Sequence, residues 1–207
     1  MRVLVTGVTG QVGGALVARA APDGIEWIAA GRDRLDLSAP EGIADALAAL
    51  APDAVVNPAA YTAVDAAETD GDTAFRVNRD GPAALAAACA ARGIPLIHLS
   101  TDYVFDGTGT RPYRTDDPVA PLGVYGASKE AGERAIREVL DDHAILRTAW
   151  VYAADGKNFV NTMLRVGAER DELRVVADQR GTPTPAGDIA DAVATLLAAR
   201  RDGTAVR

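Results

Sequence analysis

Residues 2–13 have the sequence RVLVTGVTGQVG, a short β-branched run followed by three glycines spaced G-x-x-G-x-x-G. Gly7 permits a tight turn, Gly10 lets the backbone approach a pyrophosphate, and Gly13 lets a helix pack closely on the strand. Unpaired N–H groups at the start of that helix would face the phosphates, where the helix dipole favours negative charge. The stretch predicts a strand, a turn and a helix that bind a dinucleotide. A turn that serves only helix packing is the alternative.

Strand-like and helix-like segments alternate behind this motif. Strands are expected over residues 2–6, 25–30, 53–57, 94–99 and 144–148. Helices are expected over residues 11–21, 40–50, 72–91, 124–140, 158–169 and 188–200. Such alternation predicts parallel βαβ units, and continuous apolar strands predict a sheet covered on both faces. We expect an α/β fold with a doubly wound parallel (Rossmann) sheet, which places ligands at the carboxyl ends of the strands.

The pattern loosens after about residue 150. A short strand is expected at 173–176, a loop with two prolines at 178–185, and the start of another strand at 204–207. Residues 1–150 are therefore expected to form an NAD(P)-binding Rossmann domain. Residues 151–207 are expected to form an incomplete C-terminal substrate lobe, interleaved with the Rossmann sheet.

Composition narrows the function classes. The chain has 207 residues, 48% of them hydrophobic, and a net charge of −8, which disfavours binding to nucleic acid or to an anionic membrane. The single cysteine, Cys89, cannot form an internal disulfide and fits a reducing compartment. No apolar run approaches the ~20 residues of a membrane span, and the first residues resemble a strand rather than a signal peptide. We expect a cytoplasmic protein.

The end of the second expected strand bears on the choice of cofactor. Arg32 there would accommodate the 2′-phosphate of NADPH, whereas the neighbouring Asp33 would suit the ribose diol of NADH. Asp36 and Leu37 follow on the same loop and could flank the adenine ring. We expect NADPH and keep NADH open; a solvated charged turn is the alternative.

A proton donor is indicated by the sequence YGASK at residues 125–129. Its spacing puts Tyr125 and Lys129 on one face of a helix, where a nearby ammonium would lower the pKa of the phenol. Tyr125 is then a candidate general acid for a carbonyl. Thr101 follows the fourth strand and would point into the same site; a turn-capping hydroxyl and a surface Tyr–Lys pair are the alternatives. His98, inside that strand, is expected to be a hydrogen-bonded core residue.

Several stretches together carry a resemblance to a known family. They are residues 6–13 (TGVTGQVG), 57–68 (NPAAYTAVDAAE), 100–107 (STDYVFDG), 125–129 (YGASK), 147–153 (RTAWVYA) and 178–184 (DQRGTPT). The chain resembles the extended short-chain dehydrogenase/reductases, and within them the dTDP-4-dehydrorhamnose reductase family. The matches run along the whole chain and are specific as a set.

The resemblance implies roles for individual residues. Thr101 would hydrogen-bond the C4 carbonyl oxygen of the substrate, Tyr125 would protonate it, and Lys129 would hold the nicotinamide ribose and tune Tyr125. The cofactor contacts would be Gly7, Thr9, Gly10, Gln11 and Val12 at the pyrophosphate, and Ala59, Ala60 and Tyr61 beside it. The sugar nucleotide would meet Thr62, Val64, Asp102, Tyr103 and Trp150, in addition to Thr101.

The implied reaction is NADPH-dependent reduction of dTDP-4-dehydro-6-deoxy-L-mannose to dTDP-L-rhamnose. A reductase or epimerase for another 4-ketohexose nucleotide, or a non-catalytic cofactor-binding regulatory subunit, are the alternatives. Some family members form a metal-linked dimer through a glutamate at the position of Ala15, so no metal is predicted here, although a homodimer is. Family members extend further at the C-terminus, so the chain is expected to be a fragment or to hold substrate by fewer contacts.

Overall fold

A computed structural model describes residues 1–203 and contains a five-stranded parallel sheet. The strands are β1 (Arg2–Val5), β2 (Glu26–Ala29), β3 (Ala54–Asn57), β4 (Leu96–Thr101) and β5 (His143–Thr148). Their order in the sheet is β2-β1-β3-β4-β5. After β1 the chain adds β2 on one side and then β3 on the other, so the topological switch point lies between β1 and β3. The carboxyl ends of β1, β3 and β4 therefore meet at one edge, which is where a doubly wound sheet binds its ligands.

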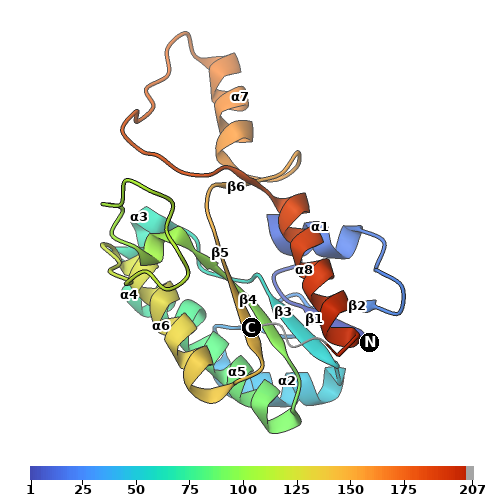
Figure 1. The fold of residues 1–207 in the computed structure, drawn as a ribbon. Helices are drawn as coiled ribbons and strands as arrows, with labels where there is room; N and C mark the ends of the chain where they lie inside the picture. The colour runs from blue at the N-terminus through green and yellow to red at the C-terminus, as the bar shows by residue number, and fades with distance from the viewer. Residues whose placement is uncertain (204–207) are drawn as a thin grey trace.

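Helices cover both faces of the sheet (Figure 1). On one face lie α1 (Gln11–Ala18) and α8 (Ala186–Arg201), which pack against each other. On the other face lie η1 (Pro40–Gly42), α2 (Ile43–Leu50), α5 (Gly81–Arg92) and α6 (Val124–Val139). Each face has its own apolar core, one around Leu4, Leu47 and Leu85 and the other around Val5, Leu16 and Val193. This three-layer arrangement confirms the predicted doubly wound α/β fold.

The long helix predicted over 72–91 is interrupted. It consists of α4 (Gly71–Phe75), the π-helical turn η2 (Arg76–Asp80) and α5. Pro82 lies in the first turn of α5 and has no N–H to donate backward, which is compatible with a change of hydrogen-bonding pattern just before it. Short elements that were not predicted are α3 (Val64–Ala67) and η3 (Asp102–Val104), which follow β3 and β4.

The strand predicted at 173–176 is wrong. The structure has no regular element there, and the side chains of Leu173, Val175 and Val176 are exposed. A strand needs a neighbour to complete its hydrogen bonds, and no described strand lies beside this segment. The strand expected at 204–207 lies outside the described residues.

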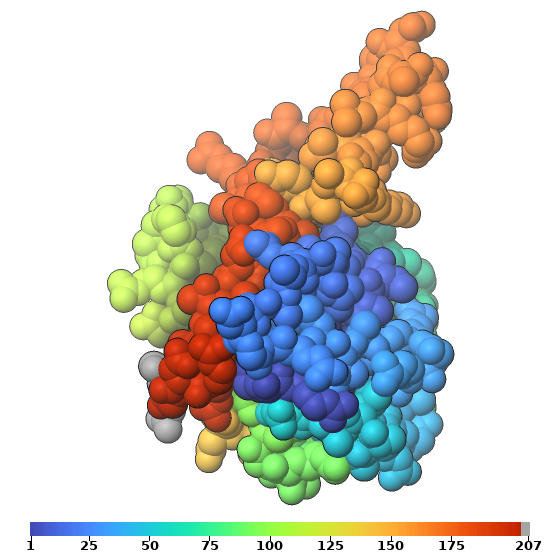
Figure 2. Space-filling view, turned by 90° about the vertical axis from the view of Figure 1, so that its right-hand side faces the viewer, coloured from blue at the N-terminus to red at the C-terminus, as the bar shows by residue number. Residues whose placement is uncertain are grey.

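The part of the chain after β5 leaves the main body and returns to it. Strand β6 (Val151–Tyr152) pairs in parallel with β7 (Thr184–Pro185), and between them the chain forms α7 (Phe159–Glu169) and a long loop. Figure 2 shows this segment projecting from the body, while α8 returns against it. Among residues 1–203, the helices are all too short or too polar to cross a bilayer.

Candidate active site

The glycine-rich turn forms as predicted, and each of its three glycines has a different structural role. Gly7 has a φ of +56°, and a Cβ there would lie 2.9 Å from Cα of Ala59 in the loop after β3. At Gly13 a Cβ would lie 2.3 Å from the carbonyl oxygen of Gly7, so α1 packs directly on the turn. Gly10 is exposed and donates its N–H to the Gly7 carbonyl. The turn is therefore tight, and its outer surface is open to a ligand.

The start of α1 fits a pyrophosphate. None of the described side chains caps this end, and no acidic residue lies in its first turn. Backbone N–H groups near Gln11 and Val12 are thus placed for an anion, with the positive end of the helix dipole behind them. Thr9 is exposed on the same turn. The Gln11 side chain is committed elsewhere, because it donates to the Val151 carbonyl over 3.2 Å and accepts from Asn158 over 3.0 Å.

The residues predicted around the adenosine lie in two environments. Arg32 is exposed after β2 and forms no ion pair among residues 1–203, so its guanidinium is available for a phosphate. Asp36 accepts hydrogen bonds from the N–H and hydroxyl of Ser38, both over 2.8 Å, which lower the pKa of its carboxyl. Leu37 is buried in the core against Gly81, so its side chain cannot flank an adenine ring while it stays there.

The loop after β3 is clamped by Asn78 of the π turn η2. Its side-chain oxygen accepts from the Tyr61 N–H over 2.9 Å, and its nitrogen donates to the Tyr61 carbonyl over 3.0 Å. The same nitrogen donates to the Ser128 hydroxyl on α6 over 3.0 Å. Ala59 and Ala60 precede the clamp and are partly buried, Thr62 follows it and is exposed, and Val64 begins α3.

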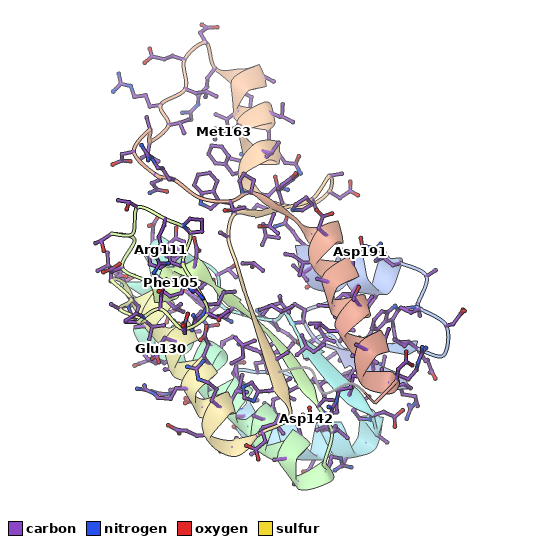
Figure 3. All side chains as sticks on the ribbon, in the orientation of Figure 1. Phe105, Arg111, Glu130, Asp142, Met163 and Asp191 are labelled. Atoms are coloured by element: carbon purple, nitrogen blue, oxygen red, sulfur yellow. The ribbon has the colours of Figure 1, made fainter. Side chains whose placement is uncertain are left out.

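Thr101 and Tyr125 lie at the carboxyl end of β4. The Thr101 hydroxyl accepts from the Tyr103 N–H over 3.2 Å and donates to Asp102 over 3.3 Å. The Tyr103 ring meets the Tyr125 ring edge to face, with centroids 5.5 Å apart. Gly126 allows this approach, since a Cβ there would lie 2.2 Å from the Tyr103 carbonyl oxygen. Figure 3 shows Phe105 and Arg111 on the segment that continues past this end of β4, near α6 and its Glu130.

The Tyr125 phenol is protonated in this environment. Burial raises its pKa above the usual value; the nearby Thr101 hydroxyl partly offsets this, and the Asp102 carboxylate adds to it. The expectation that Lys129 lowers the pKa of Tyr125 is not met, since the pKa of Tyr125 is raised and Lys129 does not contribute to the shift. The reason is that the Lys129 amine is held by β4.

Lys129 is almost fully buried, with 1% of its surface exposed. Its Nζ donates to the Leu99 carbonyl over 2.7 Å and lies 3.2 Å from Nε2 of His98. Burial lowers the Lys129 pKa to about 8, against the opposing effect of the Glu133 carboxylate. His98 is fully buried and hydrogen-bonded on both ring nitrogens, which confirms it as a satisfied core histidine.

One turn beyond Lys129, Glu133 joins α6 to β5. Its carboxylate is fully buried and accepts two hydrogen bonds from Arg147, over 2.9 and 2.6 Å, and one from Arg137 over 3.0 Å. Burial alone would raise the pKa of this carboxyl, but the arginines outweigh burial and lower it. The ion pair therefore holds the helix that carries Tyr125 and Lys129 against the sheet.

Trp150 lies where the chain leaves β5. Its φ is +47°, which is uncommon for a residue with a bulky side chain, and its indole packs on Gly181. Trp150 is exposed, as a residue that meets a substrate needs to be, and its carbonyl accepts the Thr184 N–H over 3.2 Å. No group of three or more His, Cys, Asp or Glu side chains within residues 1–203 is arranged to hold a metal ion.

Sequence reasoning missed three contributors to this site. Asn78 gave no signal, because its position depends on the π turn. Asn57 was predicted only as the end of a strand, although its side chain bonds to both Thr6 and His98. In the sequence, Glu133 is one of several charged residues on a predicted helix. Its burial follows only from the way α6 packs against β5, which brings Arg147 to it.

Comparison with known proteins shows where the chain belongs. The family model described as "RmlD substrate binding domain" matches residues 1–206. A "dTDP-4-dehydrorhamnose reductase" of Sinorhizobium fredii is 52% identical over 95% of this chain and 66% of that protein. Solved structures similar to this one include a dTDP-4-dehydrorhamnose reductase from Clostridium acetobutylicum, with TM-score 0.92, 38% identity and 97% and 71% of the two chains covered.

Another solved relative carries a cofactor. The Bacillus anthracis dTDP-4-dehydrorhamnose reductase in complex with NADP has TM-score 0.91 and 37% identity, over 95% of this chain and 70% of that one. The present chain spans about two thirds of the length of these relatives. Because the family match extends over nearly every residue and the sheet order, glycine turn and YGASK helix all agree with it, the chain belongs to the RmlD substrate binding domain family.

Proposed function

We propose that the chain carries the cofactor site and the proton donor of an NADPH-dependent reductase. The substrate is dTDP-4-dehydro-6-deoxy-L-mannose, and its C4 ketone is reduced to give dTDP-L-rhamnose. The observation that carries this proposal is the position of Tyr125, a partly buried phenol beside Thr101 at the carboxyl end of β4. The glycine turn lies at the carboxyl end of β1, on the same edge of the sheet.

The residues present fit this chemistry. NADPH, when bound, supplies the hydride that reduces the ketone. The backbone at Gly7, Gly10 and the start of α1 would hold its pyrophosphate, and Arg32 its 2′-phosphate. A phenol whose pKa is raised stays protonated at neutral pH, so Tyr125 is in the right form to donate a proton to the carbonyl oxygen. The Thr101 hydroxyl would orient that oxygen.

We propose that the chain divides at about residue 150. Residues 1–150 would bind the cofactor, with Thr9, Gln11, Val12, Ala59, Ala60 and Tyr61 beside it. Residues 151–207 would form part of the substrate region and pack back on the sheet through α8. Thr62, Val64, Asp102, Tyr103 and Trp150 surround the carboxyl ends of β3, β4 and β5, which is where the sugar nucleotide would lie.

The proposal is tested by the loss of NADPH absorbance with purified chain and dTDP-4-dehydro-6-deoxy-L-mannose. Tyr125→Phe keeps the ring and removes the hydroxyl, so turnover is expected to fall by about 10²- to 10⁴-fold while NADPH affinity is unchanged. NADPH binding, followed by its fluorescence, is measured in parallel. Binding without turnover in the unmodified chain contradicts the reductase in this chain and supports a regulatory subunit. Absence of binding contradicts the cofactor site.

The proposal includes a cellular setting and an assembly. A single buried thiol, Cys89, is compatible with a reducing compartment such as the cytoplasm. A homodimer would bury apolar side chains that the chain exposes on α7, such as Phe159 and Leu164. Light scattering would show a mass twice that of the chain; a single-chain mass contradicts the dimer and leaves the reductase unaffected.

A further inference from the structure

Four polar side chains form a buried line beneath the proposed site. Thr6 follows β1, Asn57 ends β3, His98 lies in β4, and Lys129 comes from α6. None exposes more than 1% of its surface. The parallel register sets Asn57 directly beside His98, so their side chains emerge on the same face of the sheet. The line joins the glycine-rich turn to the helix that carries Tyr125.

The hydrogen bonds at one end of the line fix the Asn57 amide. The Thr6 hydroxyl donates to Asn57 Oδ1 over 2.6 Å, and it accepts from the Ala59 N–H over 3.4 Å. If the Asn57 amide were flipped, its nitrogen would face Thr6 in place of its oxygen. The Thr6 hydroxyl would then lose Oδ1, the acceptor that it has among the described residues, and a buried donor without an acceptor is costly. The amide nitrogen therefore faces His98, 3.0 Å from Nδ1.

The Asn57 amide in turn fixes the tautomer of His98. Burial lowers the pKa of this ring well below its usual value, so it is neutral and carries one ring proton. Nδ1 receives the Asn57 N–H and must be the unprotonated nitrogen. The proton is then on Nε2, which faces Nζ of Lys129 at 3.2 Å.

An ammonium has three N–H groups and no lone pair, so it cannot accept a hydrogen bond. A charged Lys129 would therefore place one donor, its Nζ–H, against another, the Nε2–H of His98. A neutral amine accepts from His98 Nε2–H and still donates to the Leu99 carbonyl. We propose that His98, in the tautomer set by Asn57 and Thr6, is a positioning residue that favours the neutral amine form of Lys129 over the ammonium. A neutral amine gives no electrostatic assistance to a phenolate, and Tyr125 stays a proton donor.

Other charged groups near α6 do not alter this balance. Glu133 favours an ammonium at Lys129, but Arg147 and Arg137 bind that carboxylate, and η2 presents the uncharged Asn78 to the same helix. The titratable groups on or packed against α6 include His98 of β4, Arg147 of β5, Asp102 and Tyr103 of η3, Glu68 beside α3, Arg79 of η2, and Tyr125, Glu130, Glu133, Arg134, Arg137 and Glu138 of α6 itself.

The composition makes a direct test practical. The chain has two lysines, Lys129 and Lys157, and two histidines, His98 and His143. Lysine labelled with ¹³C at Cε therefore gives two signals in an NMR pH titration, and ¹⁵N-labelled histidine reports which ring nitrogen carries the proton. We expect the Nε2–H tautomer at His98 and a Lys129 midpoint at or below pH 8, well below the ordinary lysine value of about 10.4. An Nδ1–H tautomer, or a Lys129 midpoint close to the ordinary lysine value, overturns the inference.

A matched pair of variants separates positioning from packing. His98→Gln places an amide near the position of Nε2 that can turn its oxygen to the amine, so the Lys129 midpoint is expected to rise by about one pH unit or more. His143→Gln makes the same change at the partly buried first residue of β5 and is expected to leave the Lys129 midpoint in place. An unchanged Lys129 midpoint in folded His98→Gln contradicts the inference; if that variant does not fold, the tautomer and midpoint of the unmodified chain still decide.

This inference rests on the proposed function for its catalytic meaning, but its test does not. If the unmodified chain shows no turnover yet His98 is the Nε2–H tautomer and Lys129 titrates low, the reductase proposal fails and the positioning role stands. If turnover is found but Lys129 titrates near pH 10.4, the positioning role fails and the reductase stands. With both in place, His98→Gln is expected to shift the pH profile of turnover without changing NADPH affinity at neutral pH.

Discussion

The indole ring of Trp150 lies on Gly181, so closely that a Cβ at Gly181 would meet its ring atoms at 2.6 to 2.9 Å. The two residues are 31 positions apart, on either side of the projecting α7 segment. Their contact, together with the β6–β7 pairing, closes the base of that segment. The positive φ of Trp150 belongs to the same junction and stores backbone strain of about 1–3 kcal/mol.

Gly181→Ala is expected to displace the Trp150 indole and to cost about 1–3 kcal/mol of unfolding free energy. Because Trp150 is among the residues proposed to meet the sugar nucleotide, the KM for that substrate is expected to rise. Acrylamide quenching of tryptophan fluorescence measures the exposure of the ring. Gly42→Ala is the matched control, since a Cβ there meets nothing within 4 Å. Equal quenching in both variants would contradict this account of the junction.

Gly7→Ala is expected to lower both stability and NADPH affinity. The added methyl would lie 2.9 Å from Cα of Ala59, and the positive φ adds about 1–2 kcal/mol of strain. Chemical denaturation and NADPH fluorescence measure the two effects. Gly14→Ala, on the next turn of α1, brings its Cβ only to 3.4 Å from a carbonyl oxygen and is expected to be neutral or slightly stabilising. Normal NADPH binding by Gly7→Ala would argue against the turn as the pyrophosphate site.

Glu133→Gln is expected to cost about 3–5 kcal/mol at neutral pH, because Arg147 and Arg137 lose a buried charged partner. The pKa of Glu133 is lower in the folded chain than in the unfolded one, so its stabilisation is full above the unfolded value of about 4.3. That stabilisation is lost as pH falls through the folded pKa, and the gap between variant and unmodified chain closes in acid. Thermal unfolding across pH measures it.

The control for this prediction is Glu130→Gln on the same helix. Glu130 pairs with an exposed Arg134 at 3.6 Å, and such surface pairs contribute about 0–1 kcal/mol. A similar loss of stability in both variants at neutral pH would show that burial of the Glu133 carboxylate is not what matters.

Cys89 is expected to resist thiol reagents in the folded chain. Its side chain is fully buried, and burial raises the pKa of the thiol to about 12, so very little reactive thiolate exists at pH 8. Labelling with a chromogenic disulfide should be slow in buffer and fast in denaturant. In buffer, the labelling rate is expected to be limited by how often the fold opens to expose Cys89. Immediate stoichiometric labelling without denaturant would contradict the burial of α5 against the sheet.

Local signals in the sequence were sufficient for the overall architecture. The strand at residues 2–5, the glycine turn and the helix from Gln11 all form where their spacing places them, because turn geometry and hydrophobic periodicity depend on residues close together in the chain. The prediction failed at 173–176, where β-branched residues have no neighbouring strand among residues 1–203 to pair with. Pairing is a non-local condition that composition does not express.

The residues of the candidate site were named from the sequence, but their states were not. That Tyr125 and Lys129 share a helix face follows from 3.6 residues per turn. That Lys129 turns to His98 and Leu99 rather than to Tyr125, and that Asn78 clamps the loop at Tyr61, depends on how α6 and η2 pack on the sheet. The sequence determined which groups are present and on which elements. The tertiary structure alone decided their partners, burial and protonation, because hydrogen bonding and desolvation act between atoms brought together from distant parts of the chain.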